Sequence, residues 1–223
     1  MFFPARGAAP LGTLVHFHGN AENMTSHFGF SAWLQDAGFN VFIFDYRGYG
    51  ASSGEKDLSG AVLDGVAALE YVRSRPDVDK TCLLVLGQSL GAAIAVAAVK
   101  ISSEGVRGLA LDSPFRSFRS VARDRLERLV LTWPLAWPLS RVLISDRYSP
   151  EREIRSLKGI PLLILHGDKD RVVPYPEGAA LFKTAPEPKT LWAIEGGVHT
   201  DALGARKDVY RPKIVEFFRS CLP

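Results

Sequence analysis

The 223-residue sequence has few cysteines, no long apolar run and little net charge, and each shortage excludes a class of protein. Its two cysteines, Cys82 and Cys221, are too few for a disulfide framework, so we expect two reduced thiols. No run of about 18 apolar residues occurs, and therefore no membrane span is predicted. The formal charge of +3 gives no indication of nucleic-acid binding, and no zinc-finger, phosphate-loop or RNA-binding motif is present.

Metal and dinucleotide signatures are also missing. The histidines and carboxylates lack a ligand spacing such as H-E-x-x-H, and Gly48-Tyr49-Gly50 lacks the third glycine and the following helix of a dinucleotide fingerprint. We therefore predict neither metal nor cofactor. Residues 1–6 have neither the basic start nor the apolar stretch of a signal peptide, which predicts a cytoplasmic chain. Phe2-Phe3 reads as the end of a strand, so upstream strands or a membrane anchor are the alternative.

The most informative stretch is a buried strand that runs into a glycine-flanked serine. Residues 83–86 are continuously apolar, Gly87-Gln88-Ser89-Leu90-Gly91 matches G-x-S-x-G, and an alanine-rich helix is predicted over 90–100. Strand, sharp turn and helix together are the context of a nucleophile elbow, in which side chains at the two glycines would collide with the packing. Ser89 is therefore the candidate nucleophile. The alternative is an ordinary helix N-cap, a position that serine favours.

Strands and helices alternate along the rest of the chain, which predicts a mostly parallel sheet with helices on both faces. A hydrophobic share of 47% is ample for one core, and we read residues 1–223 as a single α/β domain with one insertion over about 115–158. Strands are predicted over 11–18, 39–45, 83–86, 108–112, 161–166 and 190–195, and helices over 26–37, 57–75, 90–100, 118–131, 177–184 and 208–219.

One of the five histidines has the right position for a catalytic base. His16 lies within a strand and is expected in the core, while His18 and His166 stand where a strand meets a glycine and are expected to pack locally. His27 is expected at the start of a helix. His199 follows the last strand in a glycine-rich loop, and functional groups gather on the loops at the carboxyl ends of parallel strands. His199 is therefore the candidate base.

The residues alone leave three candidates for the acid that would orient this histidine. The loop over 166–174 offers Asp168 and Asp170, of which one is expected to support the turn, and Asp112 ends the preceding strand. The chain order Ser…Asp…His is that of the α/β hydrolases rather than of the other two common triad arrangements.

These residues predict acyl transfer. Ser89 would attack a carbonyl after giving its proton to His199, and water would release the resulting acyl-enzyme. The oxyanion would need two backbone amides, for which we expect Leu90, at the N-terminus of its helix, and Asn20, in the loop after the first strand.

Three motifs carry a family resemblance. His18-Gly19-Asn20-Ala21-Glu22-Asn23, Asp45-Tyr46-Arg47-Gly48-Tyr49-Gly50-Ala51-Ser52 and the serine pentapeptide resemble the Bem46-like group of the α/β-hydrolase superfamily, over about residues 11–218. The resemblance implies that Asp170 is the acid and that Asp168 supports it. It also implies that Gly196-Gly197-Val198-His199 is the histidine loop, and that the substrates are esters or thioesters of acyl chains, at membranes in many relatives.

Small-molecule esters, thioesters or other acyl compounds are thus the expected substrates. Two alternatives stay open: a serine aminopeptidase or oligopeptidase, because peptidases share this fold and triad, and a scaffold that kept the fold without catalysis. Labelling by a fluorophosphonate probe separates a scaffold from an enzyme, and aminoacyl amides separate a peptidase from an esterase.

The expected insertion is basic, and insertions at this place form lids over the site. Residues 116–155 contain nine arginines against five carboxylates, and Trp133 and Trp137 stand beside prolines. One hypothesis is peripheral contact with a membrane or an acyl chain, with tryptophan at the interface and arginine near anionic head groups. The alternative is that the tryptophans pack on the core and the arginines form a solvated face.

Overall fold

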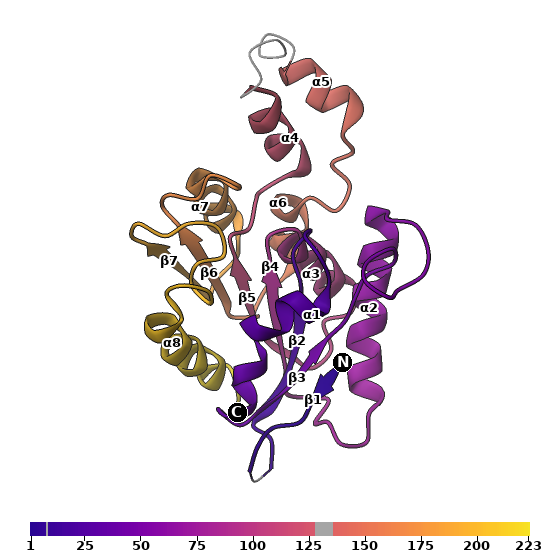
Figure 1. Cartoon of the computed structure of the whole chain (residues 1–223), viewed down its shortest axis with the longest axis vertical. Helices are drawn as coiled ribbons and strands as arrows, with labels where there is room; N and C mark the ends of the chain where they lie inside the picture. The colour runs from indigo at the N-terminus through magenta and orange to yellow at the C-terminus, as the bar shows by residue number, and fades with distance from the viewer. Residues whose placement is uncertain (8, 128–135) are drawn as a thin grey trace.

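A computed structural model describes residues 1–7, 9–127 and 136–223, which form a seven-stranded sheet in the order β1-β3-β2-β4-β5-β6-β7 (Figure 1). Only β1 is antiparallel, against β3, and every other pair of neighbours in this sheet is parallel. The predicted α/β architecture is confirmed. The strands are β1 (Phe2–Phe3), β2 (Gly12–Phe17), β3 (Phe39–Ile43), β4 (Leu83–Gln88), β5 (Val106–Asp112), β6 (Leu162–Gly167) and β7 (Lys189–Ile194).

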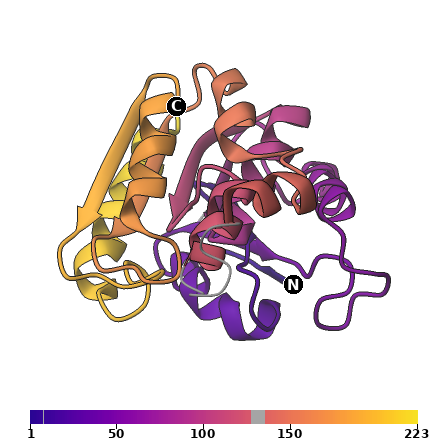
Figure 2. The same ribbon diagram turned by 90° about the horizontal axis from the view of Figure 1, so that it is seen from above.

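Helices cover both faces of this sheet, as the view from above shows (Figure 2). Successive side chains of a strand point to opposite faces, so Leu83 and Val85 pack with one helical layer and Leu84 and Leu86 with the other. All four are fully buried, which explains why the strand is apolar at every position rather than at alternate ones. The first layer contains α2 (Leu58–Ser74), α3 (Leu90–Ile101) and α7 (Tyr175–Thr184), and the second contains the 3₁₀ turn η2 (Ala32–Gln35) and α8 (Lys207–Ser220).

The helix predicted over 26–37 is wrong. That segment is divided into α1 (Met24–His27), the 3₁₀ turn η1 (Phe28–Phe30) and η2, and His27 ends a helix instead of beginning one. The break lies at Ser31, whose φ of −130° and ψ of −24° are outside the helical range, so a continuous helix cannot pass through it. Its buried side chain lies 2.8 Å from His16 Nδ1, and this contact with a strand residue accompanies the break.

The insertion between β5 and β6 begins with α4 (Phe118–Glu127), and α4 and α5 stand above the carboxyl ends of the strands (Figure 1). The helix predicted over 118–131 is confirmed as far as Glu127. Trp133 falls outside the described residues, as does the side chain of Trp137, so the tryptophan hypothesis and the lid remain predictions. No helix in the described ranges has the length and apolarity to cross a membrane. The other elements here are α5 (Ala136–Leu143), α6 (Pro150–Glu153) and the turn η4 (Ile154–Ser156).

Candidate active site

The turn between β4 and α3 places Ser89 in a strained backbone conformation. Its φ is 53° and its ψ is −115°, a region that costs a residue with a side chain about 1–3 kcal/mol. The flanking glycines allow the close packing that holds it there. A Cβ at Gly91 would lie 2.1 Å from the carbonyl oxygen of Phe17, and a Cβ at Gly87 would lie 2.7 Å from Ala92 Cα. Both positions therefore exclude any side chain, as the sequence predicts.

The Ser89 hydroxyl takes no part in holding this turn. Ser89 stands at the N-cap of α3, yet its side chain makes no capping hydrogen bond. The turn is fixed instead by the backbone, where Ser89 N donates to the carbonyl of Asp112 at 2.9 Å. Leu90 is the first residue of α3, so its N–H has no acceptor within the helix and lies at the positive end of the helix dipole.

Asp170 and His199, 29 residues apart, meet at the carboxyl end of the sheet. Asp170 Oδ2 lies 2.7 Å from His199 Nδ1, and Oδ1 accepts hydrogen bonds from the backbone N–H groups of Val172 and Val173. Burial alone would raise the pKa of Asp170, but hydrogen bonds from His166 and His199 outweigh it and hold that pKa below its usual range. Asp170 is therefore an ionised acceptor, and His199 Nδ1 must be its donor.

The histidine loop is fixed on both sides of His199. Gly196 N donates to Asp168 Oδ1 at 2.7 Å, and Thr200 N donates to Ser113 Oγ at 2.9 Å. With Nδ1 protonated, the neutral imidazole presents Nε2 as an acceptor, and the side chain keeps 21% of its surface exposed. Within the described residues, no hydrogen bond joins Ser89 Oγ to His199.

The three candidate carboxylates have separate positions. Asp170 lies against the imidazole, and Asp168 supports the loop. Asp112 is buried behind the serine, where its Oδ2 accepts from Gln88 Nε2 at 3.2 Å, and Gln88 Oε1 lies 3.0 Å from His16 Nε2. Burial raises the pKa of Asp112 to about 6. The sequence analysis missed this chain of hydrogen-bonded side chains. Gln88, a polar residue at the end of an apolar strand, could have indicated it.

The loop after β2 lies against the serine turn. A Cβ on Gly19 would lie 3.8 Å from Ser89 Cβ, so the backbone of the Gly19-Asn20 segment passes beside the candidate nucleophile. Tyr49 holds the next residue, because its hydroxyl donates to Asn20 Oδ1 at 2.6 Å. That bond fixes the Asn20 side chain, while its backbone N–H, the expected second oxyanion donor, belongs to the segment beside Ser89.

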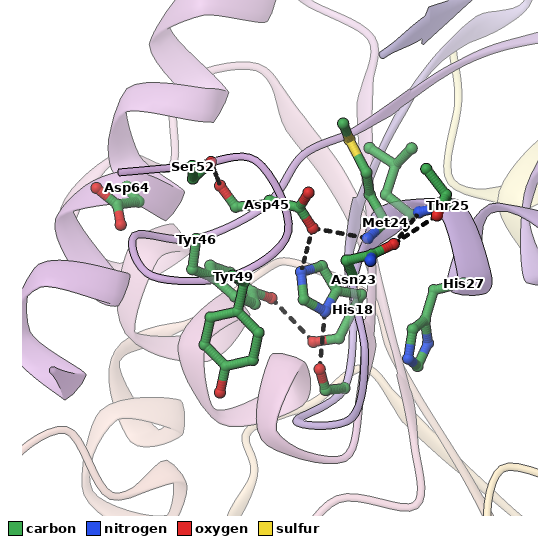
Figure 3. A network of polar contacts seen from close by, with 12 residues as sticks. His18, Asn23, Met24, Thr25, His27, Asp45, Tyr46, Tyr49, Ser52 and Asp64 are labelled. Atoms are coloured by element: carbon green, nitrogen blue, oxygen red, sulfur yellow. Dashed lines mark hydrogen bonds and ion pairs between the residues drawn. The ribbon is translucent and has the colours of Figure 1, made fainter. Parts of the chain in front are cut away.

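A buried polar network supports this loop from behind (Figure 3). His18 Nδ1 donates to the carbonyl of Gly19 at 2.7 Å, and its Nε2 lies 3.3 Å from Asp45 Oδ1. Burial lowers the pKa of His18, which favours the neutral ring. Tyr46 donates its hydroxyl to the His18 carbonyl, and Met24 N donates to Asp45. His18 packs locally as expected, whereas the contact of Asp45 with the start of α1, through Met24 N, was missed.

An apolar pocket of about 350 Å³ opens beside the elbow. Leu90, which directly follows the serine, forms part of its wall, and Phe118 and Ile144 of the insertion form another part. A larger hollow of about 730 Å³ adjoins His199, with Val172 and Val198 exposed in its wall. Among the described residues, no cluster of three or more His, Cys, Asp or Glu side chains could hold a metal ion.

Comparison with known proteins gives concordant matches. Residues 8–158 match the family model described as serine aminopeptidase, S33. The uncharacterized protein YfhR of Escherichia coli K12 is 39% identical over 214 residues, covering 95% of this chain and 72% of YfhR. Protein bem46 of Schizosaccharomyces pombe is 35% identical over 175 residues, covering 76% of this chain and 55% of bem46. The solved esterase Pf2001 of Pyrococcus furiosus superposes with a TM-score of 0.78 at 19% identity, covering 96% and 83% of the two chains, a likeness of fold.

Proposed function

Because this chain belongs to the serine aminopeptidase S33 family of α/β hydrolases and to its Bem46-like group, we propose that it is a serine hydrolase that cleaves carboxylic esters or thioesters. The observation that carries the proposal is the pair formed by buried Asp170 and His199, at the same end of the sheet as a strained serine whose hydroxyl caps nothing. A serine that only capped α3 would use that hydroxyl. The proposed nucleophile is Ser89, the base His199 and the orienting acid Asp170.

In the proposed cycle, His199 Nε2 accepts the proton of Ser89 as the hydroxyl attacks the substrate carbonyl. Asp170 keeps the imidazole in the tautomer with Nδ1 protonated, and stabilises the imidazolium without taking its proton. The tetrahedral intermediate collapses when His199 protonates the leaving alcohol or thiol. Water then attacks the acyl-enzyme by the same route, with His199 again as the base, and releases the acid. The contact between Ser89 and His199 tightens when substrate binds, because catalytic hydrogen bonds in free enzymes are often long.

The backbone amides of Leu90 and Asn20 are the proposed oxyanion donors. The first lies at the start of α3, where the helix dipole favours negative charge, and the second lies on the loop that packs beside Ser89. The loss of one such donor in a serine hydrolase costs about 100- to 1000-fold in rate. Tyr49 and His18 hold the second donor's loop, so they are positioning residues in this scheme.

The apolar pocket beside Leu90 is the proposed acyl site. Its volume of about 350 Å³ is at the small end of the range for ligand pockets, roughly 300–1,000 Å³. Short and medium acyl chains should therefore be preferred over palmitoyl. Among the described lining residues, no uncommitted carboxylate is present for the ammonium group of a peptide, because Asp57 caps α2 and lies 3.7 Å from Arg47. This favours esters and thioesters over aminopeptidase substrates.

A panel of p-nitrophenyl esters from acetate to palmitate, with matched acyl thioesters, tests the proposal on wild type and Ser89→Ala. We expect the largest kcat/KM for butyrate to octanoate and loss of the activity in Ser89→Ala. Aminoacyl p-nitroanilides go in the same assay. Faster cleavage of these amides than of any ester would replace the proposal with a peptidase, and no cleavage of either class by folded protein would support a scaffold.

A further inference from the structure

The insertion contains a second hollow, of about 300 Å³, whose walls are polar and mostly basic. It lies between α4, α5 and α6 and shares no lining residue with the apolar pocket, since Ile144 lines that pocket and Asp146 lines this hollow. Five arginines face it against two carboxylates. The lining residues are Arg116, Arg119, Arg123, Arg141 and Arg152, the carboxylates Asp146 and Glu151, and Ser117, Ser120 and Ser140.

Two of these arginines, Arg119 and Arg152, form no ion pair with a carboxylate of residues 1–7, 9–127 or 136–223. Arg119 is held by a neutral group, because its Nε donates to the carbonyl of Ile144 at 2.9 Å, which leaves the two terminal nitrogens of the guanidinium for another acceptor. Arg152 makes no ion pair within the described residues. Each is a planar fork of N–H donors, and this geometry matches the oxygens of a phosphoryl group.

The remaining charges of the hollow are mostly engaged with residues outside it. Arg116 pairs with Glu177 at 3.3 Å and Arg123 with Glu127 at 3.5 Å, both through Nε. Buried Asp146 is occupied by the start of α4, where it accepts from Arg119 N at 3.2 Å, and by the Ser149 hydroxyl. The Glu151 carboxylate also lines the hollow, and no cation of the described residues forms an ion pair with it.

We propose that this hollow binds a phosphoryl group through Arg119 and Arg152. Because neither arginine has an ion-pair partner among the described residues, an incoming dianion gains charge-assisted hydrogen bonds without breaking an existing ion pair. The terminal nitrogens of Arg119 supply the first contacts, and Ser120 of α4, which is buried, also lines the hollow. The site is separate from the proposed Ser89 chemistry and does not depend on it.

A phosphoryl group can come from a soluble phosphate compound or from a phospholipid headgroup, and the residues around the hollow are compatible with either. A soluble phosphate compound needs only the hollow. A phospholipid headgroup would also need apolar side chains at the rim, and Val142 and Leu143 of α5 are 81% and 69% exposed directly after Arg141. The shared chemistry is the phosphoryl group, and the experiment separates the sources.

Pyrophosphate is titrated into the full chain by calorimetry at constant ionic strength, with chloride as the balancing anion. We expect saturable binding to one site with a Kd of about 1 mM or tighter. The double variant Arg119→Gln/Arg152→Gln should weaken it at least about tenfold. The matched control is Arg107→Gln/Arg219→Gln, which removes the same charge from two exposed arginines that bind backbone carbonyls outside the hollow, and it should change Kd less than about twofold.

Glu151→Gln tests the same site with the opposite sign, because removal of the unpaired carboxylate should tighten binding several-fold. This single substitution still tests the site if the double variant folds poorly. Sedimentation with phosphatidylcholine vesicles, with and without phosphatidylglycerol, forms the second arm. Pelleting with phosphatidylglycerol that pyrophosphate reverses identifies a headgroup, and binding of pyrophosphate without pelleting identifies a soluble phosphate. The proposal is overturned if wild type binds neither probe, if both double variants lose binding equally, or if Glu151→Gln does not tighten it.

Discussion

Replacement of Asp170 by asparagine probes the proposed chemistry with almost no change of shape. The Asp170 carboxylate lies 2.7 Å from His199 Nδ1 and is buried, so little water screens the pair when the imidazole becomes an imidazolium. With an effective dielectric constant of about 20, charges at this separation attract by about 6 kcal/mol. The amide removes this attraction and also lets His199 adopt the wrong tautomer. The comparable loss in a serine protease triad is about 10⁴-fold, which equals about 5.5 kcal/mol.

We therefore expect kcat of Asp170→Asn on its best p-nitrophenyl ester to fall about 10³- to 10⁴-fold, with KM changed less than about threefold. Asp168→Asn is the matched control, since that carboxylate lies two residues away in the same loop and only accepts from Gly196 N, a bond that an asparagine oxygen can keep. It should retain at least about a tenth of the activity. The reasoning is refuted if Asp170→Asn keeps more than a tenth of wild-type kcat, or if Asp168→Asn is the more damaging of the two.

Three further predictions follow from packing, burial and hydrogen bonding. Gly91→Ala should lower the free energy of unfolding, measured in urea, by about 3 kcal/mol or more, because its Cβ would overlap the Phe17 carbonyl. Gly29→Ala is the control, since open space surrounds its Cβ, and it should change that free energy by less than about 1 kcal/mol. Equal effects of the two substitutions would contradict the packing argument. Burial raises the pKa of Asp112 to about 6, so the folded state holds this proton more tightly than the unfolded state does. The free energy of unfolding therefore falls as pH rises from about 4 to about 6, by up to about 3 kcal/mol. Asp112→Asn should therefore gain melting temperature relative to wild type between about pH 4 and pH 7, and a pH-independent difference would show that the carboxyl is not perturbed. Tyr49→Phe removes the hydroxyl that holds Asn20, and it should lower kcat about three- to tenfold while the free energy of unfolding changes by about 1 kcal/mol or less. An unchanged kcat would show that Tyr49 does not position Asn20.

The parts of the fold that were predictable are those set by local pattern. Apolar runs such as 83–86 become strands buried on both faces. The two glycines predict the serine turn, because close backbone contacts exclude every side chain at their positions. The segment over 26–37 was not predictable from its own residues. Its helical pattern is interrupted at Ser31, which has a non-helical backbone and a tertiary contact with His16 of β2 that the segment's own residues do not reveal.

The candidate site shows the same division. The carboxyl-end rule, together with the position of His199 in a glycine-rich loop after the last strand, was enough to select His199 as the candidate among five histidines. It could not separate Asp168 from Asp170, since both lie in one loop and the direction of each side chain depends on tertiary contacts. The resemblance pointed to Asp170, which lies against His199, while Asp168 turns to the backbone of Gly196.

The central claim is that Ser89 is an activated nucleophile, and covalent labelling by a fluorophosphonate followed by mass spectrometry of the peptides tests it most directly. Ser113→Ala is the matched control, because Ser113 has the same positive φ of 53° at the end of the neighbouring strand, but its hydroxyl is occupied by Thr200 N. We predict one adduct per chain, on Ser89, that persists in Ser113→Ala and disappears in Ser89→Ala. Folded wild-type protein that takes up no probe, or an adduct that survives Ser89→Ala, would contradict the account.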